Sequence, residues 1–290
     1  MQIIRFLSTN GATLVGVTQN DQLIGIFQPG TTLSELLHLS LSELRERIEH
    51  ITQSSEEIIA HLLPPIDGES EVWAAGVTYK RSEVARREES DTPDIYSRVY
   101  TAERPEIFFK ANARRVSGAE AAIAIRADST WNVPEPELVV VTNTAGEIVG
   151  YTIGNDVSSR SIEGDNPLYL PQAKVYAGSC ALGPGITPVW EIADPYVLTI
   201  NMTIERNGQT YWSGQTNTAE LKRKLGELVN YLYREDEFPD GAFLCTGTAL
   251  VPDAPFTLEA NDIVHIDIDQ LTSLHNHVVQ GKTALLSSRR

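Results

Sequence analysis

The sequence predicts an α+β protein in which a small N-terminal cap precedes a larger, strand-rich body. Short apolar runs separated by turn residues recur through most of the 290 residues, as expected for strands and hairpins. Helical periodicity is confined to a few stretches. Pro64 and Pro65 end one of these stretches and mark a boundary. We therefore expect a small α+β cap domain at residues 1–65 and a second domain at residues 70–290.

The cap is expected to combine three strands with two helices. Asn10 with Gly11 and Asn20 with Asp21 favour tight turns between the strands. Ser34 and Ser42 are suitable N-caps for the helices. The predicted elements are strands at residues 3–7, 13–18 and 23–27 and helices at residues 34–39 and 42–63. The apolar stripe of the longer helix is formed by Leu44, Ile48, Ile51, Ile58, Ile59 and Leu62.

The body is expected to be mainly strands. A polar helical stretch is broken near Thr92 and Pro93, and Asn207 with Gly208 forms a tight turn. A turn at residues 143–146 joins a central hairpin. The predicted strands lie at residues 72–77, 108–109, 123–125, 138–141, 147–155, 196–204, 243–251 and 263–268, and the helices at residues 82–101 and 218–233.

Composition limits the possible partners. The net charge is −16, from 39 acidic and 23 basic residues, which argues against nucleic acid and anionic membranes as partners. An anionic sugar acid stays possible, because a metal ion and a few basic side chains can reverse the local field. The two cysteines have no metal or redox spacing and suggest buried thiols. Neither a membrane span nor a signal peptide is recognisable, so we expect a cytoplasmic protein.

Three acidic residues near the middle of the chain form the main candidate site. Glu135 and Glu137 precede an apolar run, and side chains two residues apart share one face of a strand. Asp156 ends the returning strand of the same hairpin. Three carboxylates without His or Cys favour a hard ion, Mg²⁺ with Mn²⁺ or Ca²⁺ possible. The ordinary alternative is an exposed acidic strand face on an acidic protein.

The expected register brings these carboxylates together. If residues 143–146 are the whole loop, Thr142 pairs with Glu147. Glu135 then lies opposite Gly154, which leaves room for an ion, and Asp156 lies opposite Val133. In this register Asp156 is a diagonal neighbour of Glu135 on the same face.

Motifs in a fixed order resemble the fumarylacetoacetate hydrolase superfamily over roughly residues 71–279. These motifs are Glu135–Glu137, Gly150–Arg160, Lys174, Ala181–Gly185, Thr246–Thr248 and Asn261–Val264. Further segments resemble the subgroup of 2-keto-3-deoxy-pentonate dehydratases, typified by enzymes acting on 2-keto-3-deoxy-D-arabinonate. These segments are Gly76–Tyr79, Ala102–Lys110, Trp131–Glu137 and Glu163–Lys174.

The resemblance implies a mixed β-roll fold, a homodimer or homotetramer, and Mg²⁺-dependent dehydration to 2,5-dioxopentanoate. It also implies that Glu135, Glu137 and Asp156 hold the metal and that Glu106 and Lys174 transfer protons. The aromatic residues after Glu106 would raise its pKa, and a neighbouring dication would favour neutral, basic Lys174. The predicted substrate-binding residues are Thr248, Phe108, Lys110 and Arg81, with Arg86 as a further candidate.

Two other features bear on the function. Hydrolases of the superfamily carry a His three residues after a Tyr; here Tyr79 is followed at that distance by Ser82, which cannot act as a general base. The change favours a dehydratase over the alternatives, a C–C hydrolase such as an acylpyruvate hydrolase or a 2-keto-acid decarboxylase. A non-catalytic protein that binds metal and keto acid is a third possibility. His275 and His277 share a strand face, but we expect a structural role for them.

Overall fold

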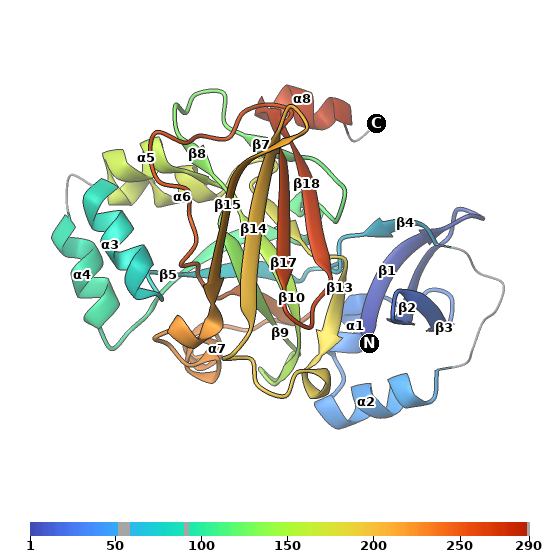
Figure 1. The fold of residues 1–290 in the computed structure, drawn as a ribbon. Helices are drawn as coiled ribbons and strands as arrows, with labels where there is room; N and C mark the ends of the chain where they lie inside the picture. Colours follow the sequence, from blue (N-terminus) through green and yellow to red (C-terminus); the bar gives the residue numbers. More distant parts are fainter. Residues whose placement is uncertain (52–58, 90–92, 289–290) are drawn as a thin grey trace.

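The computed structural model describes residues 1–51, 59–89 and 93–288 (Figure 1). It contains two large packed β-sheets and a two-stranded sheet of β8 (Asn132–Val133) and β11 (Ser158–Ser159). The larger sheet runs from the cap into the body. Its strands, in spatial order, are β3 (Gln22–Ile26), β2 (Thr13–Gln19), β1 (Gln2–Ser8), β13 (Gly185–Pro188), β10 (Ile148–Asp156), β9 (Pro136–Thr142), β16 (Ala242–Cys245), β5 (Glu71–Gly76) and β6 (Glu106–Asn112). Off this path, β4 (Ile59–Leu63) pairs with β1, and β12 (Cys180–Leu182) pairs with β10.

The second sheet packs across the first. Its strands, in order, are β15 (Gln209–Asn217), β14 (Thr199–Arg206), β17 (Ile263–Ile268), β18 (Ser273–Gln280) and β7 (Ile123–Ile125). It lies in front of β9 and β10 in Figure 1. Ile153 of β10 and Ile266 of β17 belong to one buried cluster between the two sheets. Two strand pairs, β5 with β16 and β7 with β18, are parallel in an otherwise antiparallel arrangement.

Strand β9 is buried on both faces. Leu138 and Val140 pack into the core between the sheets, whereas Val139 and Val141 pack into a second core that includes Leu37 of the cap. A strand covered on both sides has no polar face, which explains its continuous apolar run. The strand that begins beside Glu135 and carries Glu137 is therefore fixed from two directions.

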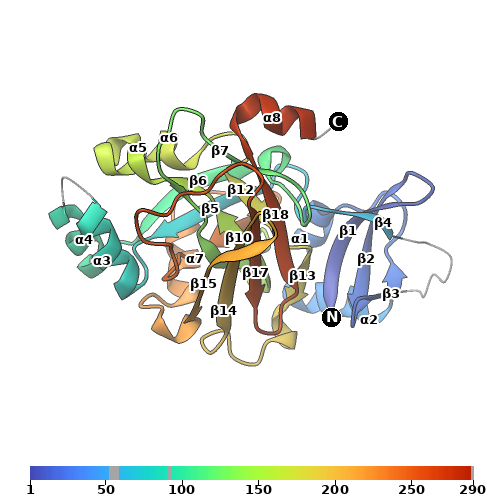
Figure 2. The same cartoon turned by 45° about the horizontal axis from the view of Figure 1, so that its top comes forward.

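The helices occupy the margins of the sheets. They are α1 (Leu33–Leu37), α2 (Leu41–Glu49), α3 (Lys80–Glu89), α4 (Pro93–Thr101), α5 (Arg160–Asp165), α6 (Leu170–Lys174), α7 (Leu225–Leu232) and α8 (Gly281–Ser288). Helices α3 to α6 gather at the end of the body remote from the cap (Figure 2). No helix among residues 1–51, 59–89 and 93–288 is both long and apolar enough to cross a membrane.

The predicted α+β class is confirmed, with segregated helices and mixed sheets. The cap is continuous with the body, because Ile3 and Ile4 of β1 pair with Ile186 and Gly185 of β13. The assignment of residues 1–65 to a separate domain stays a prediction.

The predicted helix at residues 42–63 is wrong in its second half. Helix α2 ends at Glu49, and residues 59–63 form β4, where Leu62 pairs with Phe6 of β1. A short apolar run fits a helix and a strand equally well. Pairing with β1 makes residues 59–63 a strand. Ile58 lies outside the described residues.

The predicted N-caps are also displaced by two residues. Thr32 and Ser40 are the caps, and each forms a reciprocal capping box with the Glu three residues later. Ser34 and Ser42 lie inside the first turns.

The predicted hairpin register is wrong by two residues. Thr142 pairs with Ile148, so the loop has one residue more than expected. An irregularity between Ile148 and Gly150 adds a second residue, and Gly150 pairs with Val141. An even shift keeps every side chain on its original face. The predicted convergence of the carboxylates therefore survives the error.

Smaller differences concern element ends. The predicted helix at residues 218–233 is a 3₁₀ turn at Thr218–Glu220 followed by α7. The strand expected at residues 243–251 stops at Cys245, because the chain turns at Gly247, whose φ is +91°. The strand expected at residues 196–204 begins at Thr199. The polar stretch at residues 82–101 is helical on both sides of the predicted break, as α3 and α4.

Asn143 sets the observed hairpin register and offers a test. Its Oδ1 accepts hydrogen bonds from the N–H groups of Ala145 (3.1 Å) and Glu147 (2.8 Å). Its Nδ2 donates to the carbonyl of Leu39 (3.0 Å) in the cap. Asn143→Ala should lower the free energy of unfolding by roughly 2 kcal/mol, because three partly buried backbone groups lose their partner. Urea denaturation measures this, with Thr144→Ala as the control. Equal stability of the two variants would contradict the assignment.

Candidate active site

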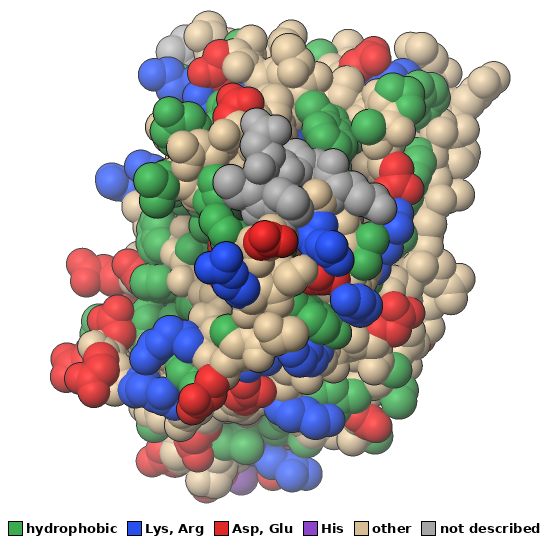
Figure 3. Space-filling model, turned by 90° about the vertical axis from the view of Figure 1, so that its left-hand side faces the viewer, with side chains coloured by type: hydrophobic (Ala, Val, Ile, Leu, Met, Phe, Trp, Pro, Cys, Tyr) green, Lys and Arg blue, Asp and Glu red, His purple; other side chains and the backbone are tan. Residues whose placement is uncertain are grey.

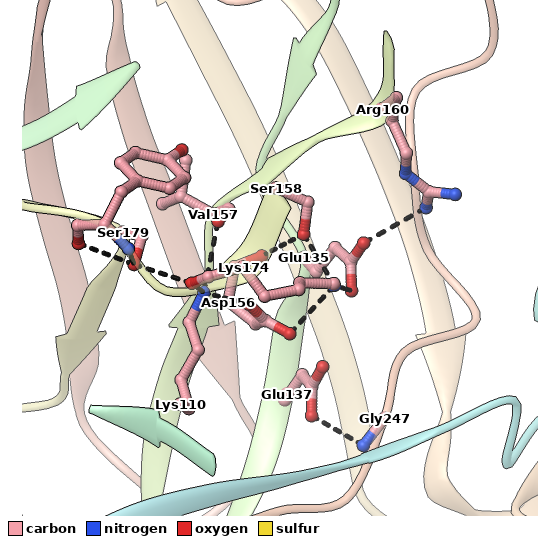
Figure 4. A network of polar contacts seen from close by, with 11 residues as sticks. Lys110, Glu135, Glu137, Asp156, Val157, Ser158, Arg160, Lys174, Ser179 and Gly247 are labelled. Carbon is pink, nitrogen blue, oxygen red and sulfur yellow. Dashed lines mark hydrogen bonds and ion pairs between the residues drawn. The ribbon is translucent and has the colours of Figure 1, made fainter. Parts of the chain in front are cut away.

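The three predicted metal ligands lie together at one end of the central hairpin (Figure 4). Glu135 precedes β9, Glu137 lies within it and Asp156 ends β10, and all three are buried. The Asp156 N–H donates to the Glu135 carbonyl (3.0 Å), which holds the strand ends together. One carboxylate oxygen from each residue lies within 4.8 Å of the others. These atoms form the one such cluster among the described residues.

Three basic side chains surround the carboxylates. Lys174 Nζ donates to Glu135 Oε2 (2.8 Å), Asp156 Oδ2 (2.9 Å) and Ser158 Oγ (2.6 Å). Arg160 pairs with Glu135 Oε1 (3.1 Å), and Lys110 pairs with Asp156 Oδ1. Three basic side chains therefore face Glu135 and Asp156 within the buried site.

Glu137 is less well compensated than the other two carboxylates. The Gly247 N–H donates to its Oε2 at 2.5 Å. Burial, followed by the charges of Asp156 and Glu135, raises the pKa of Glu137 well above its ordinary value of 4.5. The folded state therefore favours the protonated carboxyl group, and ionisation of Glu137 lowers the free energy of unfolding as pH rises above 4.5. An all-oxygen ligand set with unfavourable negative charge fits a hard dication such as Mg²⁺.

Gly154 has a different role from the predicted one. It pairs with Glu137 rather than with Glu135. A Cβ at this position would lie 2.6 Å from Val139 Cγ2 and 3.3 Å from Cys245 Sγ. The glycine therefore allows close packing in the core and does not make room for an ion.

A pocket opens beside the carboxylates and includes both predicted proton-transfer residues. Glu106 and Lys174 line it, together with Phe108, whose ring centroid lies 5.8 Å from Lys174 Nζ. Glu106 is half-buried and pairs across the sheet with Gly76. A Cβ at Gly76 would lie 2.2 Å from Glu106 Oε2, so this glycine provides the space that the carboxyl group occupies.

Thr248 and Ser82 also line the pocket, and both hydroxyls bond to the main chain. Thr248 Oγ1 accepts from the Leu250 N–H (3.0 Å), as expected of a turn residue. Ser82 Oγ donates to the Tyr79 carbonyl (2.7 Å). The position that holds a base in the hydrolases therefore faces the cavity with a small hydroxyl.

Lys110 and Arg81 are not among the pocket-lining residues. Lys110 is fully buried behind Asp156. Arg81 is exposed and pairs with Asp253 (2.7 Å). The side chain of Arg86 lies outside the described part of the chain. Substrate contact by Lys110 and Arg81 stays a prediction that this geometry does not support.

The pocket also contains residues that the sequence analysis did not select. They are Tyr96, Arg160, Glu163 and Leu170. Arg160 could have been found, because it follows Asp156 by four residues in a quoted motif. A buried guanidinium needs a carboxylate partner. The others come from α4, α5 and α6, whose positions only the tertiary structure reveals.

The pocket-lining helices lie on one face of the molecule. Figure 3 shows that Lys and Arg side chains are interspersed with Asp and Glu over this face. Acidic and basic side chains are therefore mixed on the face formed by these helices.

His275 and His277 both lie on β18 of the second sheet. His275 lies on the outer face of the second sheet, with its ring 4.6 Å from that of His265 and its Nδ1 3.4 Å from Glu120. The expected structural role of His275 agrees with this cross-strand packing.

The fold and the carboxylate cluster together define a family. The model of the fumarylacetoacetate (FAA) hydrolase C-terminal domain matches residues 71–279. The chain belongs to this family, as its motifs predicted.

Several individual proteins are similar to this chain over most of its length. A probable 2-keto-3-deoxyxylonate dehydratase of Haloferax volcanii is 44% identical, over 94% of this chain and 95% of its own. A 2-dehydro-3-deoxy-D-arabinonate dehydratase of Saccharolobus solfataricus is 47% identical over 72% of each chain. A solved 2-keto-3-deoxy-D-arabinonate dehydratase, complexed with magnesium and 2,5-dioxopentanoate, superposes with a TM-score of 0.83 at 35% identity. That match covers 97% of this chain and 100% of the other.

Two ligand variants should behave differently without metal. Glu137→Gln should leave stability nearly unchanged, because burial already disfavours the ionised form. Asp156→Asn should lower the free energy of unfolding by about 3–5 kcal/mol, since two buried lysines lose their shared partner. Thermal and urea unfolding in EDTA measure both effects.

Added Mg²⁺ should raise the unfolding temperature of the unmodified protein and should not raise that of Glu137→Gln. Equal stabilisation of both proteins by Mg²⁺ would show that Glu137 is not a ligand of the metal ion.

Proposed function

We propose that this protein is a magnesium-dependent dehydratase that converts 2-keto-3-deoxy-D-arabinonate, or a related 2-keto-3-deoxy-pentonate, into 2,5-dioxopentanoate. The observation that carries the proposal is the buried carboxylate cluster beside a pocket in the same fold as the relative bound to magnesium and 2,5-dioxopentanoate. The two similar sequences, at 44% and 47% identity, are named for the same reaction type.

The names of these two relatives describe one compound when both sugars belong to the D series. D-Xylonate and D-arabinonate differ only at carbons 2 and 3. Both stereocentres are absent from the 2-keto-3-deoxy acid, in which carbon 2 is a ketone and carbon 3 a methylene group. The proposed substrate therefore has a single stereocentre, at carbon 4.

The reaction requires several proton transfers. A proton leaves carbon 3 and the hydroxyl group leaves carbon 4 as water. The aldehyde of the product is at carbon 5, so one C–H hydrogen and the O–H hydrogen at carbon 5 must then leave as protons, and one proton returns to each of carbons 3 and 4. Bound Mg²⁺ would act as a Lewis acid on the 2-keto group. The chain must supply groups that move protons at the neighbouring carbons.

Glu106 and Lys174 are the proposed proton-transfer residues. Both line the pocket, Glu106 from β6 and Lys174 from α6. The Phe108 ring lies beside Lys174 and excludes water from that side of the pocket. Ser158, Glu135 and Asp156 hold the Lys174 amine in one position. Preorganisation of this kind keeps a proton-transfer group within reach of the substrate.

Product analysis tests the reaction directly. We expect NMR to show 2,5-dioxopentanoate formed from racemic 2-keto-3-deoxy-pentonate and Mg²⁺ in deuterated water, with deuterium at carbons 3 and 4. EDTA should abolish turnover, and Mg²⁺ or Mn²⁺ should restore it. Full activity after exhaustive chelation, or cleavage of a C–C bond, would refute the proposal.

Substitution of the proton-transfer residues should lower kcat without loss of metal binding. Glu106→Gln and Lys174→Met should each lower kcat by roughly 10²-fold or more. Gly76→Ala should also lower kcat, because the added methyl group displaces the Glu106 carboxyl group. Steady-state kinetics at saturating Mg²⁺ measures all three, with exposed Lys224→Met as the control. Wild-type kcat in any variant would remove that residue from the mechanism.

The hydrolase alternative is tested with acylpyruvates. A hydrolase must activate water, and Ser82 cannot do so. We expect little or no pyruvate from acylpyruvates, and Ser82→His should remain folded because the position faces the cavity. Efficient cleavage of acylpyruvates by the unmodified protein, without semialdehyde formation from the sugar acid, would favour the hydrolase.

We further propose that the protein works in the cytoplasm as a homodimer or homotetramer. The family resemblance supports the assembly. Light scattering after size-exclusion chromatography tests the oligomeric state; a monomer at micromolar concentration would refute it.

A further inference from the structure

Lys110 is fully buried although it lies in β6, an edge strand of the larger sheet. It occupies an irregular point in β6, because Phe109 pairs with Trp73 and Ala111 pairs with Val72. Lys110 is thus the extra residue of a β-bulge. Bulges commonly redirect a side chain beside an active site.

The ammonium group of Lys110 faces protein groups. It donates to the carbonyls of Lys174 (2.6 Å) and Val157 (3.2 Å), and it forms an ion pair with Asp156 Oδ1. Its side chain is fully buried and does not line the pocket. These contacts argue against the predicted substrate-binding role.

These contacts join two parts of the site that come from different elements. Asp156 and Val157 mark the end of β10, and Lys174 ends α6. Lys110 pairs with Oδ1 of Asp156, whereas Lys174 pairs with Oδ2 of the same carboxylate. Figure 4 shows Lys110 extending to this junction from the side opposite Arg160.

We propose that Lys110 is a positioning residue that holds the Asp156 carboxylate and the main chain of Lys174 in a fixed relation. The inference rests on the proposed metal-dependent reaction. It assigns to Lys110 an effect on metal affinity and on the placement of the Lys174 amine, without contact to substrate. Partners that orient a metal ligand typically change affinity or activity 10–100-fold when removed.

The sign of the change in metal affinity distinguishes this role from its alternatives. If Lys110 acted only through its charge, its removal would strengthen cation binding, because a nearby positive charge is lost. If it only supported the fold, removal would lower stability and leave the affinity unchanged. A positioning role predicts weaker binding despite the lost positive charge.

Lys110→Met is the variant to test, with Mn²⁺ as a spectroscopic substitute for Mg²⁺. Titration followed by electron paramagnetic resonance of free Mn²⁺ should show binding weakened about 10-fold or more. Lys224→Met is the matched control and should bind Mn²⁺ as the unmodified protein does, because Lys224 is exposed and packs on Tyr196. Equal or tighter binding by Lys110→Met would overturn the inference and leave the proposed function intact. Failure of the unmodified protein to bind Mn²⁺ would overturn both.

Kinetics at saturating Mn²⁺ tests the second half of the inference. Lys110→Met should still lower kcat about 10-fold, because the Lys174 carbonyl has lost its hydrogen bond from Lys110. KM for the sugar acid should not change. An unchanged kcat would overturn the claim that Lys110 positions Lys174.

A double variant decides the outcome if Lys110→Met does not fold. Lys110→Met combined with Asp156→Asn removes both charges of the buried pair. Recovery of folded protein, measured by circular dichroism, would show that unpaired Asp156 caused the failure and would support the pairing. Failure of the double variant as well would show that the carbonyl contacts dominate and would overturn the assigned action on Asp156.

Discussion

A row of buried charges with alternating sign constrains the whole catalytic end of the molecule. In order, it consists of Arg160, Glu135, Lys174, Asp156 and Lys110. Each carboxylate uses its two oxygens for different cations. An isolated buried charge is very costly, so the elements that carry these residues must assemble together. Burial favours the protonated form of Glu137 in the metal-free site, and a bound dication would favour its ionised form and leave the site positive, as an anionic substrate requires.

Much of the arrangement of strands could be predicted from sequence because it depends on period-two patterns and turn residues. The central hairpin shows both the strength and the limit of this approach. Its apolar run identified β9, but the loop length depended on bonds made by Asn143, which pattern analysis did not include. The face of each carboxylate was nevertheless right, because face depends on parity and tolerates a two-residue error. The helix expected at residues 42–63 failed because pairing with β1 lies beyond local sequence.

Residue chemistry predicted the centre of the site better than its surroundings. The three carboxylates, Glu106 and Lys174 are brought together as their spacing and family motifs suggested. Lys110 illustrates the limit. A lysine in a segment that resembles the dehydratases suggests an anion site, yet the bulge in β6 turns the side chain towards two carbonyls and a carboxylate. Sequence reveals the charge of a side chain, whereas its neighbours decide whether that charge is available.

The sheet provides the carboxylates and the helices provide other pocket-lining residues, and this separation affects how such an enzyme can change its substrate. The carboxylates lie on a hairpin packed from both sides, and few substitutions there would preserve the core. The opposite wall comes from α3 to α6, short segments that contribute Ser82, Tyr96, Glu163 and Leu170 and that have limited roles in the main cores. New substrate preferences could therefore arise by substitutions at these four positions while the ion-holding hairpin, Arg160 and Lys174 stay constant. Libraries confined to Ser82, Tyr96, Glu163 and Leu170 would be the economical starting point for redirecting the enzyme to other keto acids.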